Sequence, residues 1–188
     1  MTKTILKSSN SATRLPQLFA ATTIGIALLA LVGWQVNMRF LAGQWDSYVP
    51  MAPSTALAFL LLAGALFGFA RWHSQRASRL FALIAASGVC LLGVLVLAQF
   101  ITGIDLGVEQ VLSRTNELLG STPLGRMSPL TAVAFVLESA AFLILLIAQP
   151  RRNAPTAAAL LATAATAINA VVVIGYAYGV PLLYGGTI

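Results

Sequence analysis

Charged residues are scarce in this sequence. They make up 9% of its 188 residues, whereas a soluble domain carries about 25%. Hydrophobic residues make up 59% and fall in long runs with few or no charges. This distribution excludes a soluble globular core. It predicts helices in a lipid bilayer, because a helix satisfies its own backbone hydrogen bonds there.

Cysteine and histidine each occur only once, as Cys90 and His73. Cys90 lies inside an apolar run, so neither an internal disulfide nor a thiolate metal cluster is available. His73 lies in a basic connection, which favours an interfacial role over axial ligation of a haem or pigment. Paired carboxylates, clustered histidines and a nucleophile with its base are also lacking. We therefore expect no metal, no cofactor and no enzymatic activity.

Five apolar runs are long enough to span the hydrocarbon layer, which takes about 20 residues. We predict an all-α membrane protein, a bundle of about five transmembrane helices. Residues 1–16 are expected to form a basic N-terminal segment, and residues 17–188 a single transmembrane domain. The first run is too long for a signal peptide and has no cleavage site, so we interpret it as an uncleaved anchor. The predicted spans are approximately 17–36, 54–72, 80–103, 130–149 and 156–180.

The basic residues explain the net charge of +6 without nucleic acid, because they gather between the spans. Eight of the eleven lie on one side, and by the positive-inside rule that side is cytoplasmic. We predict a multi-pass protein of the bacterial inner membrane, with a cytoplasmic N-terminus and the C-terminal Tyr184 to Ile188 in the periplasm. The eight are Lys3, Lys7, Arg14, Arg71, Arg76, Arg79, Arg151 and Arg152.

The sequence repeats itself at a spacing of 76 residues. Met51-Ala-Pro-Ser-Thr-Ala-Leu-Ala-Phe59 returns as Met127-Ser-Pro-Leu-Thr-Ala-Val-Ala-Phe135, and eight of fifteen positions are identical from 51 to 65. Both segments enter the membrane from the outer side. We therefore predict parallel helical-hairpin repeats, the last one incomplete. The shared residues are Met51, Pro53, Thr55 and Phe59, and Met127, Pro129, Thr131 and Phe135.

The repeated prolines and threonines have two interpretations. Pro53 and Pro129 suit the first helical turn, where a missing N–H costs nothing, and the hydroxyls of Thr55 and Thr131 could bond to free backbone groups beside them. These residues are then helix-entry signals only. The alternative is that they contact a ligand at the outer surface.

Glu138 is the one acidic residue within a predicted span. An ionisable group there costs about 2.5 kcal/mol or more, so it is a candidate functional site. Its repeat counterpart is Leu62, so helix packing does not require a carboxylate. At about 1.5 Å per residue, Asn169 lies at a similar depth. We predict that Glu138 faces the bundle and bonds to Asn169 or Thr166, either as a structural clamp or as a ligand or proton site.

The outer loop, residues 104–129, places Val108, Val111 and Leu112 among charged residues. This spacing is compatible with a short amphipathic helix at the membrane interface. It would form a lid on the bundle or a ligand-binding element.

Within the membrane, Gly64 and Gly68 are four residues apart and would allow another helix to approach closely.

The sequence resembles the multi-span N-terminal sensory regions of bacterial membrane histidine kinases and diguanylate cyclases. The resemblance covers about residues 30–188, through the two repeated segments and Gly103-Ile-Asp-Leu-Gly-Val-Glu-Gln110. In such proteins the membrane unit feeds a cytoplasmic output, often through PAS modules. No output signature is present here, and a third Pro-x-Thr-Ala helix would be expected to follow Ile188.

Three functions remain open at this point. The chain could be a sensory or scaffold domain that signals through helix movements. It could instead be an accessory or assembly subunit of a larger respiratory or photosynthetic complex, or a small transporter. Its expected partners are the lipid bilayer and either other membrane subunits or further copies of itself, but not nucleic acid.

Overall fold

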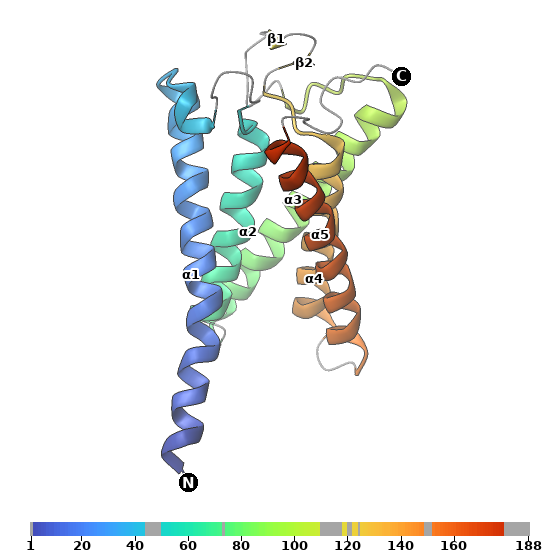
Figure 1. Ribbon diagram of the computed structural model, residues 1–188. Coiled ribbons are helices and arrows are strands. Elements are labelled where there is room, and N and C mark those ends of the chain that lie inside the picture. The colour runs from blue at the N-terminus through green and yellow to red at the C-terminus, as the bar shows by residue number, and fades with distance from the viewer. Residues whose placement is uncertain are drawn as a thin grey trace.

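The computed structural model describes residues 2–43, 50–72, 74–109, 118–119, 122–123, 125–148 and 152–178 (Figure 1). Every long helix in this part of the chain is apolar enough to cross a membrane, and there are five, which confirms the predicted fold class and a multi-pass membrane protein. The helices are α1 (Thr2–Gln35), α2 (Pro53–Arg71), α3 (Arg76–Thr102), α4 (Pro129–Ile147) and α5 (Ala154–Ala177).

Shorter elements lie at one end of the bundle. The 3-10 helix η1 (Arg39–Ala42) follows α1, and the two-residue strands β1 (Leu118–Leu119) and β2 (Thr122–Pro123) pair antiparallel. We call this end the loop end. The opposite end, where Arg71 and Arg76 flank the connection from α2 to α3, we call the basic end.

The helices α2 and α4 both run from the loop end to the basic end (Figure 1). They therefore have the same direction, as the repeat predicts. Both begin at a proline, Pro53 and Pro129, as expected for the first helical turn. The cap of α4 is Ser128, whose Oγ accepts a hydrogen bond from the Thr131 N–H at 3.2 Å.

The threonine hydroxyls do not cap these helices as predicted. Thr131 Oγ1 lies 2.9 Å from Ser128 Oγ, and the N-cap position of α2 is Ala52, which has no side-chain cap. The reason is position: a cap requires the non-helical residue just before the proline, whereas the threonines already lie inside the first turn.

The first helix begins earlier than predicted. We expected a separate basic segment at 1–16, but α1 starts at Thr2 and continues through Pro16 into the apolar part, Arg14–Gln35. The candidate membrane span within α1, Arg14–Gln35, agrees with the predicted span at about 17–36. Only the helix start differs, because charge marks where the hydrocarbon begins and not where a helix ends. In Figure 1 the start of α1 extends past the other helices at the basic end.

The core lies where α3 packs against both α2 and α4. The repeated aromatic residues meet there: the rings of Phe59 and Phe135 are edge to face, with centroids 4.8 Å apart. Gly93 allows α3 to approach α4, because a Cβ on it would lie 2.8 Å from Val136 Cγ2. At Gly64 and Gly68 the nearest atom to such a Cβ would be 3.5 Å away or more, so those two glycines do not mark a close contact.

The outer helices have one long neighbour each. α1 packs on α2 and α5 packs on α4, and no described residue of α1 contacts α5. The apolar surfaces of both are therefore mostly exposed: 17% of the apolar window of α1 and 11% of that of α5 are buried, against 39% for α2. In a bilayer these surfaces contact lipid.

Candidate functional sites

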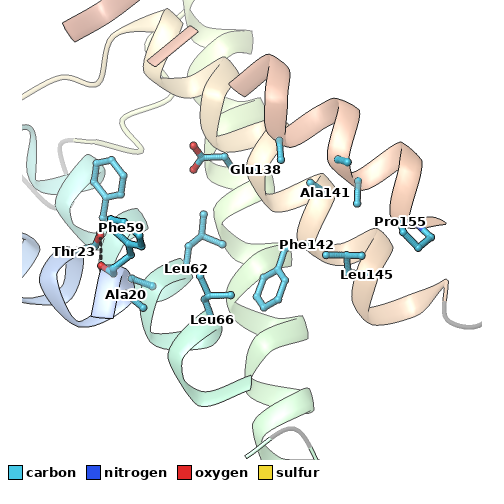
Figure 2. A pocket seen from close by; sticks show the side chains of 15 residues that line it. Ala20, Thr23, Phe59, Leu62, Leu66, Glu138, Ala141, Phe142, Leu145 and Pro155 are labelled. Carbon is cyan, nitrogen blue, oxygen red and sulfur yellow. Dashed lines mark hydrogen bonds between the residues drawn. The ribbon is translucent and has the colours of Figure 1, made fainter. Parts of the chain in front are cut away.

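A groove separates α1 and α2 from α4 and α5, and Glu138 lines it (Figure 2). We call it the lateral groove; its volume is about 540 Å³. Its walls are almost entirely apolar, with Leu62 and Leu66 of α2 across from Phe142 of α4. Thr23 also lines the groove, but its hydroxyl is bonded to the Phe19 carbonyl of its own helix at 2.9 Å.

The structure brings together Glu138 and Asn169, as the sequence led us to expect. Asn169 Nδ2 donates a hydrogen bond of 2.8 Å to Glu138 Oε1, which joins α4 to α5 inside the membrane. Thr166 does not belong to this pair: its hydroxyl is exposed and bonds to the Ala162 carbonyl at 2.8 Å. A helical threonine readily satisfies its hydroxyl on its own backbone, and Asn169 is long enough to reach the carboxylate.

Leu62 and Glu138 occupy equivalent repeat positions and line the same groove. Leucine fills this position in α2 without any polar partner. Packing of the bundle therefore does not explain the carboxylate of α4, and the role of the Glu138–Asn169 pair as a ligand or proton site stays a prediction.

A second carboxylate, Glu109, was not predicted as a site residue. It lies at the loop end and is 6% exposed. Its Oε1 accepts two hydrogen bonds, from Ser54 Oγ at 2.9 Å and from the Met127 backbone N–H at 2.6 Å. Glu109 therefore joins the start of α2 to the residue two positions before α4.

Opposing effects act on the Glu109 carboxyl. Burial raises its pKa above the ordinary value of 4.5, and this effect outweighs the bonds from Met127 and Ser54 and the charge of Arg126, which lower it. Asp105 raises the pKa slightly further. Arg126 is itself bonded to Asp105, with Nη2 2.6 Å from Oδ2.

The predicted amphipathic helix is absent from the described part of the outer loop. Residues 103–109 and 125–128 are not helical, and 110–117 lie outside the described residues. His73 lies outside them as well.

One signal in the sequence could have identified Glu109. It lies in Gly103-Ile-Asp-Leu-Gly-Val-Glu-Gln110, a mostly apolar segment in which it is the second acidic residue after Asp105.

The repeated motif residues hold the helix entries. The Met51 carbonyl accepts a hydrogen bond from Trp34 Nε1 at 2.8 Å, and the Met51 backbone N–H donates one to the Ala42 carbonyl at 2.7 Å. Met127 and Phe135 are buried in the core, and Thr55 is 8% exposed. These contacts agree with a role in helix entry and packing.

Comparison with known protein families, with curated proteins and with solved structures found no match. The resemblance to sensory membrane regions stays a prediction from the motifs.

Proposed function

We propose that this chain is a non-catalytic membrane sensory domain of a bacterial signalling protein, which responds by moving its helices. The observation that carries the proposal is the lateral groove, which Glu138 lines while its carboxyl group is bonded to Asn169 of α5. A carboxyl group at this depth is costly and is most often retained for a function.

The packing supports relative movement of two helix groups. α1 and α2 form one group and α4 and α5 the other, and α3 packs against both α2 and α4. Direct contact between α2 and α4 is slight. A ligand in the groove would thus contact both groups. If it binds more tightly at one separation of the two groups than at another, its binding shifts the protein toward that separation.

Orientation follows from charge. The described arginines that flank the spans at the basic end are Arg14, Arg71, Arg76, Arg79 and Arg152, and we place this end in the cytoplasm of a bacterial cell by the positive-inside rule. Helix movements at this end would then be available to a cytoplasmic partner.

The proposal can be tested with spin labels at the basic end. Gln75→Cys and Asn153→Cys, in a Cys90→Ser background, place one exposed label at each short connection. We expect Glu138→Gln to shift the distance distribution between the labels, because the amide cannot donate or accept a proton as the carboxyl group can. Pulsed electron paramagnetic resonance of the protein in lipid nanodiscs measures this distribution.

Thr163→Val is the control, since among the described residues the Thr163 hydroxyl bonds to its own helix alone, at the Ala159 carbonyl. It should leave the distances unchanged. A folded Glu138→Gln protein with wild-type distances would identify the carboxyl as a structural clamp and remove the support for a sensory role.

The exposed face of α5 favours a second candidate, an accessory subunit of a larger membrane complex. This helix is rich in alanine, and Ala157, Ala162 and Ala164 are exposed. Small residues allow close helix approach in membranes. Purification from native membranes decides between the two: an accessory subunit should co-migrate with its complex at fixed stoichiometry, whereas a sensory domain should not.

A further inference from the structure

A cavity of about 260 Å³ lies at the loop end, beside Glu109. We call it the loop-end cavity. It is smaller than the pockets of about 300–1,000 Å³ that hold drug-sized ligands, so any ligand must be small. Its lining combines polar side chains, Gln99, Asp105, Glu109 and Arg126, with apolar ones that include Val96 and Phe100.

The Glu109 carboxylate has one oxygen left for a ligand. Both of its hydrogen bonds from described residues end on Oε1, and none ends on Oε2. The cation that lines the cavity, Arg126, is bonded to Asp105. The cavity thus has two carboxylates for one guanidinium, and Glu109 is not the one bonded to it. A buried carboxylate without its own cation is unfavourable.

Gln99 adds a second unmet acceptor. Its Oε1 is buried and has no hydrogen-bond partner among the described residues, and the same side chain lines the cavity. Buried polar atoms of this kind are uncommon in folded proteins and call for an explanation, such as a ligand that the site is built to receive. A ligand with a hydrogen-bond donor beside Gln99 would supply the partner that its Oε1 lacks among the described residues.

We propose that the loop-end cavity binds a small primary ammonium compound. Its N–H groups donate to Glu109 Oε2 and to the amide oxygen of Gln99, and its short apolar part lies against Phe100 and Val96. An anion is disfavoured, because Asp105 and Glu109 repel it and Asp105 already occupies the guanidinium of Arg126. A charged donor also makes stronger hydrogen bonds than a neutral one.

This site deepens the proposed sensory function, and its role as the stimulus site rests on that function. Glu109 Oε1 holds Ser54 at the start of α2 and Met127 just before α4. A ligand on Oε2 of the same carboxylate would change the charge and position of the group that joins the two helix starts.

Binding can be measured directly on the full chain in nanodiscs of neutral phosphatidylcholine, by ligand-observed NMR with n-propylammonium chloride. We expect saturable binding with a Kd of about 1 mM, the range open to a ligand with so few atoms. 1-Propanol has a similar apolar chain without the charge, and tetramethylammonium has the charge without N–H donors. Both should bind at least tenfold more weakly.

Two variants locate the site. Glu109→Gln and Gln99→Leu should each weaken propylammonium binding by about tenfold or more, because each removes one acceptor. Gln35→Leu, at an exposed glutamine near the end of α1, is the matched control and should bind as the wild type does. If Glu109→Gln does not fold, Gln99→Leu decides the question by the same criterion.

Absence of saturable propylammonium binding would overturn the proposal, as would wild-type affinity in folded Glu109→Gln or Gln99→Leu, or equal binding of either comparison compound. These outcomes leave the spin-label test of Glu138 unaffected. Conversely, unchanged label distances in Glu138→Gln would overturn the sensory function while the ammonium site still binds.

Discussion

Gly93 is a residue at which a single methyl group decides helix packing. A Cβ there would lie 2.8 Å from Val136 Cγ2 and 3.0 Å from the Ala132 carbonyl oxygen, and the latter is backbone that cannot turn away. We expect Gly93→Ala to lower the free energy of unfolding by about 1–3 kcal/mol, the usual cost of overpacking. Reversible unfolding in mixed detergent micelles measures this change.

Gly88 is the matched control in the same helix. It is exposed, and nothing lies within 4 Å of the position its Cβ would take. Gly88→Ala should therefore be neutral or slightly stabilising, since alanine is the better helix former. Equal stability of the two variants would show that α3 and α4 do not pack through Gly93.

Glu109 should make stability depend on pH. Its raised pKa means that the folded protein holds this proton more tightly than the unfolded chain does. The free energy of unfolding therefore falls as pH rises from 4.5, the ordinary pKa, to the higher pKa of the folded state. Asp105 and Arg126 are the described charged groups that act on it.

Glu109→Gln removes this titration and keeps a side-chain oxygen that can accept the bonds from Ser54 and Met127. Thermal unfolding midpoints across this pH range should decline less steeply in the variant than in the wild type. Parallel profiles for the two proteins would contradict the assignment of the pH dependence to Glu109.

At the scale of the elements, local sequence patterns were sufficient to locate the five helices. Proline at the start of α2 and α4, and charges beyond the apolar runs, placed most boundaries within a few residues. The start of α1 was missed because a basic segment can remain helical outside the hydrocarbon. The loop end was missed because η1, β1 and β2 are too short to leave a periodic pattern.

The sequence predicts the Glu138–Asn169 pair but not the contacts of Glu109. Glu138 and Asn169 lie on consecutive antiparallel helices, so depth along each helix was enough to pair them. Glu109 meets Ser54 across 55 positions in the chain and Met127 across 18. These contacts depend on how non-adjacent helix starts come together, which no spacing in the sequence specifies. The lateral groove likewise depends on how four helices are arranged, since residues of α1, α2, α4 and α5 line it while no described residue of α1 contacts α5.

At the scale of the whole molecule, the uneven distribution of charge predicts the orientation in the membrane. Of the described basic residues, Arg14, Arg71, Arg76, Arg79 and Arg152 flank the spans at the basic end, whereas Arg39 and Arg126 lie at the loop end. Because positively charged segments are retained in the cytoplasm, we expect the loop end to face the periplasm. α5 runs toward the loop end (Figure 1), so the chain should leave the bundle on that side.

Reporter fusions test this orientation. Alkaline phosphatase, which is active only after export, should be active when fused after Ile188 and inactive when fused after Ser74, in the connection between α2 and α3. A fluorescent protein that folds only in the cytoplasm should give the reverse pattern at the same two points. Cytoplasmic activity after Ile188 would mean that the bundle is inverted. In that case the loop-end cavity would open to the cytoplasm and could not receive an external stimulus.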